Sequence, residues 1–264
     1  MNKLILAAIG AVAISAVPPA GAADLSPAYK APGYQQPRCS QFGGFYIGGN
    51  VGWAQLSNEW TDRNDWVDSF DFDFAIGTAK TTKDGVAGGV QGGYNWQRGC
   101  TLFGIEADGN WADLKSSKLY TPTDIPDDTK LTIDTKVNWY STLRGRTGIV
   151  YDDLLLYVTG GLAFASISQS WTMNDLGGSG QIESFSADKM RWGAAVGAGV
   201  EWAWTQNWSV RSEALWLRFK EQSTTVFSPA GALADKVANP TFDTNNSIFV
   251  ARVGVNYRFG GPGY

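Results

Sequence analysis

Apolar and polar residues alternate with a period of two along most of the chain. In residues 45–53, every second position from Phe45 to Trp53 is mostly large and apolar, whereas the positions between them are mostly small or polar. Seven further segments repeat this pattern: 86–96, 103–111, 137–151, 154–164, 192–204, 208–216 and 249–259. A period of two is that of a β-strand whose two faces meet different surroundings. The pattern therefore predicts eight strands.

The connections between the predicted strands alternate in length. Three are tight turns, at 98–100, 152–153 and 205–207, and four are long and polar, at about 58–84, 114–135, 168–188 and 221–246. Short turns at one end and long loops at the other are typical of outer-membrane barrels. All ten prolines lie outside the strand cores, as ladder hydrogen bonding requires. We predict an all-β fold, an eight-stranded antiparallel up-and-down transmembrane β-barrel over residues 42–264.

Residues 1–23 have the features of a secretory signal peptide. Lys3 precedes an apolar run from Leu4 to Val17, and small residues at 20–23 suit cleavage after Ala22 or Ala23. An uncleaved anchor is the alternative. Residues 24–41 contain three prolines and no hydrophobic period, which predicts a Pro-rich periplasmic tail. No later segment has the roughly 18 consecutive apolar residues of a transmembrane helix.

The positions of lysine indicate which face of the sheet meets water. Every lysine after the signal lies in the tail, a predicted loop or a strand end, and the charged groups inside strands are mainly arginines and acids on the small-residue face. The opposite face is nearly uncharged. Because hydrocarbon offers no partner to a charge, we expect the apolar face outward in lipid and the polar face inside. A soluble β-sandwich, which shares the strand spacing, is the alternative.

Aromatic residues gather at the strand ends, which predicts two girdles at the membrane interfaces. Toward the long loops these are Trp53, Trp111, Trp139, Trp192 and Trp216. Toward the short turns they are Phe45, Trp96, Tyr151, Trp202, Trp204, Trp208 and Phe259.

Four acids and four arginines fall on the inward face and predict a charge network in the lumen. They are Glu106, Asp108, Arg144, Arg146, Glu201, Arg211, Glu213 and Arg252. The turn at 205–207 places Glu201 opposite Arg211, a predicted cross-strand ion pair. The pair Glu106 and Asp108 could also be read as the acid and base of a hydrolase. We favour a structural network, since nearby arginines keep carboxylates ionised and remove the proton that a general acid must hold.

Composition narrows the chemistry further. The chain has no histidine, which removes most triad, acid/base and zinc chemistry, and its net charge of -4 argues against nucleic-acid binding. An eight-stranded barrel is filled by its own side chains, so an open channel is not expected. We predict no catalytic residue, cofactor site or metal site. Cys39 and Cys100 fall on the same, periplasmic side of this topology and are compatible with a disulfide.

Four segments carry a resemblance to a known family: 44–52, 157–164, 197–201 and 253–259. Together they resemble the small porin-like outer-membrane proteins of alpha-proteobacteria, often named outer-membrane immunogenic proteins. The Ala22–Leu25 signal boundary is similar as well. The resemblance implies an eight-stranded barrel with loops exposed to hosts and a role in envelope integrity, with porin or haemin-binding activity claimed for some members. One departure is that residues 260–264 follow Phe259, whereas many such barrels end on an aromatic residue.

Three functions remain open. A structural envelope protein would contact outer-membrane lipid and lipopolysaccharide, and the barrel-assembly machinery would insert it. Rim cations that could meet lipopolysaccharide phosphates are Lys83, Lys136, Lys189, Arg191, Arg218 and Lys220. Ordinary snorkelling of these side chains is the alternative. A narrow porin is the second function. The third is a binder of a ligand or of host surface molecules through the first long loop, where acids at 59–73 interleave with aromatics at 60–74; haemin would have to bind without histidine.

Overall fold

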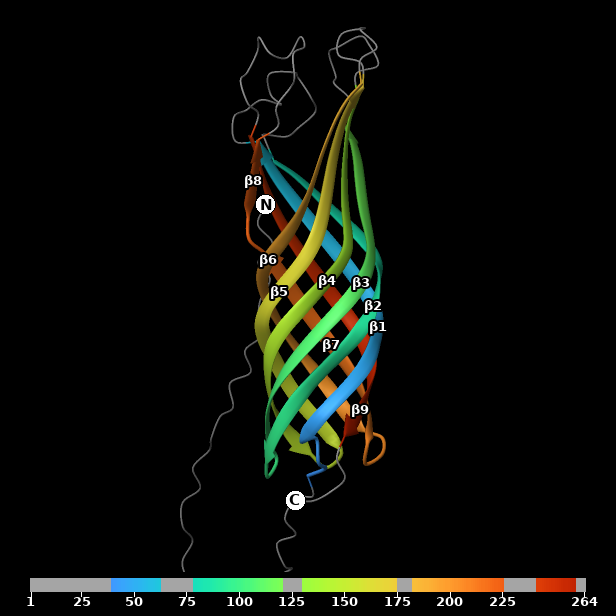
Figure 1. The fold of residues 1–264 in the computed structure, drawn as a ribbon, viewed down its shortest axis with the longest axis vertical. Coiled ribbons are helices and arrows are strands. Elements are labelled where there is room, and N and C mark those ends of the chain that lie inside the picture. The colour runs from blue at the N-terminus through green and yellow to red at the C-terminus, as the bar shows by residue number, and fades with distance from the viewer. Residues whose placement is uncertain (1–38, 63–77, 121–129, 175–181, 226–240, 260–264) are drawn as a thin grey trace, which may run out of the picture. The chain divides into compact units, whose positions relative to one another are not determined.

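The computed structural model describes residues 39–62, 78–120, 130–174, 182–225 and 241–259. The predicted signal peptide and residues 24–38 of the predicted tail lie outside these ranges. The described residues form nine strands (Figure 1): β1 (Gly44–Asp62), β2 (Thr78–Arg98), β3 (Thr101–Tyr120), β4 (Lys130–Tyr151), β5 (Leu154–Asn174), β6 (Ile182–Ala203), β7 (Trp208–Phe219), β8 (Gln222–Thr225) and β9 (Thr241–Phe259). No helix in the described part of the chain is long and apolar enough to cross a membrane.

Eight of these strands close into a barrel. Each of β1 to β6 pairs antiparallel with the next strand, β7 pairs with β9, and β9 returns to β1 with Phe259 opposite Phe45. The short strand β8 follows β7 after two residues and pairs with the same neighbour, β9. The predicted antiparallel, eight-stranded up-and-down barrel is confirmed.

The alternation in sequence becomes an alternation between the outer wall and the lumen. In β1 the Phe45 side chain is 64% exposed and the next residue, Tyr46, is 5% exposed. In β2 the same division separates outward Val86 and Val90 from buried Gln91. Large apolar side chains therefore cover the outer wall, as a surface facing hydrocarbon requires.

The strands are longer than the hydrophobic pattern predicted. Parts of all four predicted long loops are strand, including 58–62, 114–120, 168–174 and 241–246. These parts carry polar residues on both faces, so they show no hydrophobic period. Backbone ladders form there nonetheless, because their hydrogen bonds do not depend on side-chain polarity. Five lysines of these predicted loops accordingly lie in strands: Lys80, Lys83, Lys115, Lys118 and Lys130.

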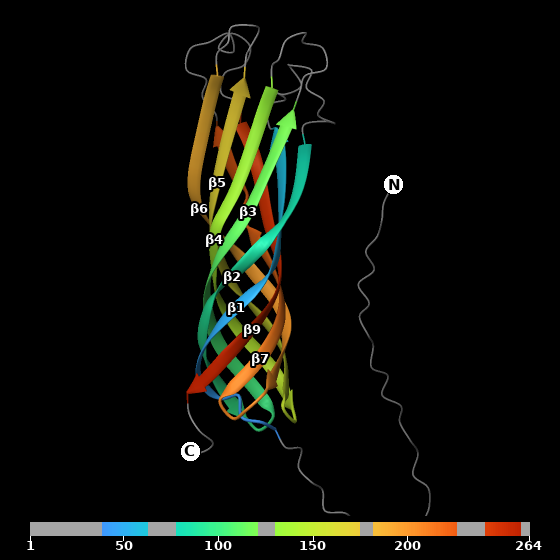
Figure 2. The same cartoon turned by 90° about the vertical axis from the view of Figure 1, so that its right-hand side faces the viewer.

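The closed ladder covers only part of the strands. Pairing of β2 with β3 runs from the turn to Ala87 opposite Ala112, and pairing of β6 with β7 runs to Gly193 opposite Phe219. Beyond these points the described ladders form two groups, β3 to β6 on one side and β2, β1, β9 and β8 on the other. We call these groups the two leaves; Figure 2 shows β3 to β6 rising together at the upper end.

A bulge in β4 reverses the facing of its residues. Val137 lies opposite Ile167 of β5, whereas Trp139 lies opposite the adjacent Ser166, so Asn138 is an extra residue in β4. An inserted residue turns the following side chains to the other face of the sheet. Val137 was expected on the outer face with Trp139, but it is buried in the lumen. That expectation was wrong because a strict period of two does not anticipate a bulge.

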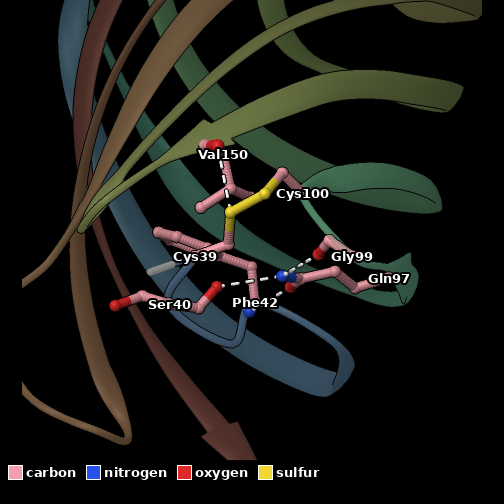
Figure 3. The surroundings of a disulfide bond; sticks show 7 residues. All are labelled: Cys39, Ser40, Phe42, Gln97, Gly99, Cys100 and Val150. Carbon is pink, nitrogen blue, oxygen red and sulfur yellow. Dashed lines mark hydrogen bonds between the residues drawn. A yellow bond between two sulfur atoms is a disulfide. The ribbon is translucent and has the colours of Figure 1, made fainter. Parts of the chain in front are cut away.

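A plug from the N-terminal segment closes the short-turn end. Phe42 is 1% exposed and packs in a cluster with Leu102, Val150, Leu155 and Tyr157. A disulfide joins Cys39 to Cys100 in the β2–β3 turn, with the two Cα atoms 5.4 Å apart (Figure 3).

Backbone contacts fix the same plug from two sides. The Ser40 amide donates to the Asp152 carbonyl at 2.8 Å, and the Phe42 amide donates to Gln97 Oε1 at 2.6 Å. Gln97 Nε2 donates in turn to the Ser40 carbonyl at 3.0 Å. Residues 39–41, expected to be the end of a tail, are thus part of the barrel's closed end.

Candidate functional site

The predicted lumen charges lie together in the middle of the barrel. All eight side chains come from β3, β4, β6, β7 and β9 and point inward, and each is at most 6% exposed. Period-two alternation on five strands brings them to one level, since a closed barrel directs every second side chain toward its axis. The structure thus brings together residues up to 146 positions apart in sequence, from Glu106 to Arg252.

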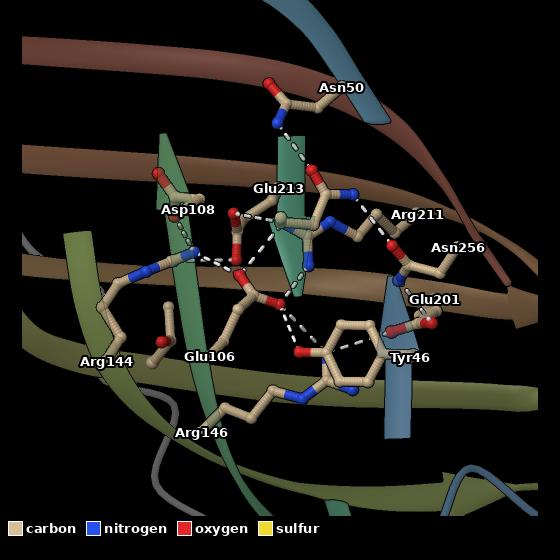
Figure 4. Close-up of polar contacts among 12 residues, drawn as sticks. Tyr46, Asn50, Glu106, Asp108, Arg144, Arg146, Glu201, Arg211, Glu213 and Asn256 are labelled. Carbon is tan, nitrogen blue, oxygen red and sulfur yellow. Dashed lines mark hydrogen bonds and ion pairs between the residues drawn. The ribbon is translucent and has the colours of Figure 1, made fainter. Parts of the chain in front are cut away.

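Glu106 is the centre of the network (Figure 4). Its carboxylate pairs directly with the guanidinium groups of Arg144 and Arg211, and lies 3.7 Å from those of Arg146 and Arg252. One carboxylate therefore faces four cations.

Two further carboxylates complete this centre. Asp108 Oδ2 is 2.9 Å from Arg144 Nη2 and 3.3 Å from Arg252 Nη2. Glu213 pairs with Arg252, and with Arg144 at 3.0 Å and Arg211 at 3.4 Å. Each arginine is thus shared between at least two acids, which a planar guanidinium with five donors suits well.

The predicted ion pair between Glu201 and Arg211 is not the one that forms. The two residues are directly opposite in the β6–β7 ladder, as the turn length predicted. Arg211, however, extends to Glu106 and Glu213, and the Glu201 carboxylate lies 3.1 Å from Arg146 Nη1. The ladder register fixes which Cα atoms lie opposite each other. A long side chain such as that of Arg211 can still extend across the lumen to pair with acids on other strands.

Neutral side chains extend the network, and sequence reasoning did not identify them. Tyr46 Oη donates to Glu106 at 2.6 Å, and Tyr157 Oη donates to Glu213 at 3.2 Å. The Arg146 guanidinium lies over both rings, 4.6 Å from the centre of Tyr46 and 5.3 Å from that of Tyr157. The period-two pattern could have identified both tyrosines, since each occupies a position whose side chain faces the lumen.

Charge balance makes this buried arrangement stable. An isolated charge in an apolar interior is strongly unfavourable, whereas a charge that is paired and fully hydrogen-bonded is tolerated. The eight residues carry four negative and four positive charges, and the carboxylates also accept bonds from Thr142, Asn256 and both tyrosines. The oxygens of these carboxylates are therefore engaged in ion pairs and hydrogen bonds within the barrel. Among the described residues no group of three acidic or cysteine side chains forms a metal site.

Apolar layers lie on both sides of the network. The Phe42 cluster fills the lumen toward the short turns. A larger cluster fills it on the other side, and its large members are Leu56, Leu114, Val137, Tyr140, Ile167, Leu215, Leu217, Phe219, Ile248 and Val250. The alternation predicted a polar lumen throughout, and these two apolar layers correct that prediction.

The predicted girdle residues face outward. The exposed members are Phe45, Trp53, Trp96, Trp111, Tyr151, Trp192, Trp202, Trp204, Trp208, Trp216 and Phe259, and Trp139 beside the bulge is half-buried. Phe249 packs on Trp53 with ring centres 6.0 Å apart, and Tyr257 on Trp208 at 5.0 Å, so these two rings extend the predicted girdles. Trp192 and Trp202 on β6 are separated by about the ten residues that a tilted strand needs to cross a bilayer.

The predicted rim cations divide into two groups. Lys83, Lys136, Arg218 and Lys220 are exposed, and Lys220 Nζ lies 5.4 Å from the ring centre of Trp192. The prediction that Arg191 lies at the exposed rim is wrong. Its side chain is buried inside the barrel, because Trp192 faces outward and neighbouring residues of a strand face opposite sides. The Lys189 side chain lies outside the described part.

A polar pocket of about 220 Å³ lies on the outer wall beside Trp216. Its lining residues are Ser57, Glu59, Lys80, Trp216, Arg218, Asn245, Asn246 and Ser247. Of the first predicted long loop, Glu59 and Trp60 belong to β1, and Trp60 is buried. The remaining acids and aromatics of that prediction lie at 62–74, where no side chain is described.

Comparison with known proteins agrees with this architecture. The family described as outer membrane protein beta-barrel domain matches residues 4–259. The 31 kDa outer-membrane immunogenic protein of Brucella melitensis is 30% identical over 82% of this chain and 83% of its own. The 22 kDa outer membrane protein of Rhizobium leguminosarum is 29% identical over 64% of this chain and 61% of its own. The crystal structure of OprG from Pseudomonas aeruginosa aligns with a TM-score of 0.47 and 12% identity over 86% of this chain and 99% of that one. The chain therefore belongs to the outer-membrane β-barrel family, among the outer-membrane immunogenic proteins of alpha-proteobacteria, and resides in the outer membrane.

Proposed function

We propose that this protein is a closed structural barrel that contributes to cell-envelope integrity. The observation that carries the proposal is the filling of the lumen: a balanced ion-pair network lies between two apolar layers. A solute or ion crossing the barrel would have to displace buried side chains at three successive levels. A structural role also fits the absence of histidine and the full occupation of the lumen carboxylates, and so we propose no enzymatic activity.

A planar bilayer holding the refolded protein tests this closed state. We expect no conductance steps from wild-type protein at high load, while a general porin refolded in the same way supplies the positive control. Discrete steps whose number grows with the amount of protein would reject the closed barrel and favour the narrow porin instead.

We further propose that the outer wall binds the phosphorylated sugar headgroup of lipopolysaccharide. The pocket beside Trp216 supports this, because Arg218 and Lys80 offer two cations and Asn245 an amide directly next to a girdle tryptophan. Cationic donors suit phosphate oxygens, and the neighbouring tryptophan is of the kind enriched at membrane interfaces, which supports a position of the pocket near the lipid headgroups. The assembly machinery and host surface molecules remain predicted partners.

Lipopolysaccharide retained through purification measures this contact. The double variant Lys80→Gln, Arg218→Gln should bind lipopolysaccharide roughly tenfold more weakly, as expected if about 1.4 kcal/mol is lost. Lys115→Gln is the matched control, since Lys115 is also exposed but is paired with Asp113 at 2.9 Å and lies outside the pocket. Equal retention by all three proteins would leave the cations as ordinary snorkelling side chains.

A further inference from the structure

We propose that a polar layer in the outer part of the lumen binds a small monovalent anion. We define this outer polar layer as Arg191, Gln169, Thr244, Asn246, Asn58 and Thr135. It lies beyond the large apolar cluster, at the level where the two leaves separate.

Arg191 is a buried cation without a carboxylate partner among the described residues. Its side chain is 5% exposed, and its guanidinium donates only to the Gln169 Oε1 atom at 3.2 Å and the Thr244 carbonyl at 3.4 Å. Its Nε atom has no hydrogen-bond partner. In contrast, each arginine of the charge network pairs with at least two acids. Buried charges are normally compensated, and none of the residues whose side chains the structure describes supplies a counter-charge to Arg191.

The neighbours of Arg191 present further unused polar atoms. Asn246 is 1% exposed, and neither its Oδ1 nor its Nδ2 atom has a hydrogen-bond partner. The same is true of Gln169 Nε2 and Thr244 Oγ1, both on residues that contact Arg191. Asn246 lies two residues from Thr244 on the same face of β9 and opposite Asn58 in the ladder with β1. Three unused donor groups, Asn246 Nδ2, Gln169 Nε2 and Thr244 Oγ1, therefore belong to the same layer as a positive charge that has no counter-charge among the described residues.

This combination selects an anion, and a small one. The N–H groups and the hydroxyl hydrogen can donate to an anion, the guanidinium charge repels a cation, and a single guanidinium charge is neutralised by one negative charge. The six residues of the outer polar layer are all at most 5% exposed, so an ion among them is shielded from solvent, and a monatomic anion needs the least added space between buried side chains. A halide-sized ion, with chloride as the abundant example, fits these requirements.

The anion would also strengthen the outer barrel. Arg191 belongs to β6, its partner Gln169 to β5 and its partner Thr244 to β9, so the layer already joins one leaf to the other. An ion held between Arg191 and Asn246 adds a second link at the place where the β6–β7 ladder ends.

Thermal unfolding of the refolded protein in detergent tests the site, comparing sodium chloride with sodium gluconate at equal ionic strength. We expect chloride to raise the unfolding midpoint of wild-type protein in a saturable way, by about 5 °C when chloride is in large excess. Arg191→Gln should lose this difference. Arg98→Gln removes an exposed arginine at the short-turn end of the same barrel and should keep it.

Three results would overturn the proposal: equal midpoints in the two salts, an unchanged chloride effect in Arg191→Gln, or stabilisation by sulfate without stabilisation by chloride. If Arg191→Gln does not fold, crystals of wild-type protein grown in bromide decide. An anomalous peak within hydrogen-bond distance of Arg191 supports the site, and its absence rejects it.

Discussion

The charge network and the outer polar layer are two solutions to the same problem, a polar group inside a barrel. In the network, four acids and four arginines from five strands balance one another's charge, although Arg144 Nε, Arg211 Nε and Arg252 Nη1 have no hydrogen-bond partner in the described part of the chain. In the outer layer, one arginine is surrounded by amides and hydroxyls with unused atoms. The difference shows that burial alone does not define a role: a balanced cluster holds strands together, whereas an unbalanced one has capacity for a partner. Substitutions can test how far the two regions differ.

The largest loss of unfolding free energy is expected when Glu106 is replaced. Glu106→Gln leaves the shape almost unchanged but removes the negative charge that faces four arginines. We expect a loss of about 3–5 kcal/mol in the free energy of unfolding, because unpaired buried charges remain. Urea unfolding in lipid vesicles measures it, with Glu59→Gln on the exposed outer part of β1 as control. A loss below that of the control would mean that the network is not the stabilising centre of the barrel.

The disulfide at the short-turn end should have the next largest effect. The double variant Cys39→Ser, Cys100→Ser opens a covalent loop with a sequence separation of 61 residues. We expect a loss of about 2–4 kcal/mol. Urea titration of oxidised and reduced wild-type protein gives the matched comparison. If reduction leaves the unfolding midpoint unchanged, the packing of Phe42 and the hydrogen bonds of Ser40 and Gln97 hold the plug without the disulfide.

The outer polar layer should be far more tolerant than the network. Asn58 Nδ2 donates to Thr135 Oγ1 at 2.9 Å, a neutral bond between the leaves. Asn58→Ala should cost about 1 kcal/mol in unfolding free energy, in line with a single neutral hydrogen bond. The same urea assay, together with Thr135→Val and the double variant, separates the bond from other effects. A loss as large as that of Glu106→Gln would erase the distinction between the two regions.

The smallest effect is expected at the exposed pair Asp113 and Lys115. Both side chains are largely exposed, at 72% and 63%. Asp113→Asn should change the unfolding free energy by less than about 0.5 kcal/mol, and the change should vanish in high salt. Repeating the urea titration at two salt concentrations checks both statements, and a loss that persists in high salt would contradict them.

The sequence predicted best where one face of a strand meets lipid. There the alternation is strict, so the facing of residues such as Phe45 and Tyr46 was correct. Outside the lipid both faces are polar, and the strand ends at 58–62 and 114–120 gave no periodic signal.

Two errors in the site have identifiable physical causes. Arg191 was assigned to the rim because it lies near the end of a predicted strand. It directly precedes the outward-facing Trp192, however, and so its side chain faces the lumen. Partners across the lumen, such as Arg211 with Glu106, depend on the three-dimensional closure of the barrel and on side-chain reach. The sequence pattern indicates which face of a strand each residue occupies, but it does not indicate which side chains pair across the lumen.

The two leaves extend the described sheet well beyond the tryptophans predicted to form the outer girdle. From Trp139 in the outer girdle, β4 continues back to its first residue, Lys130. At the usual rise per residue this is about 30 Å of strand. An antibody approaching from outside therefore meets a rigid stalk of sheet before it reaches the lipid headgroups, and epitopes on that stalk are held in one conformation by the ladders.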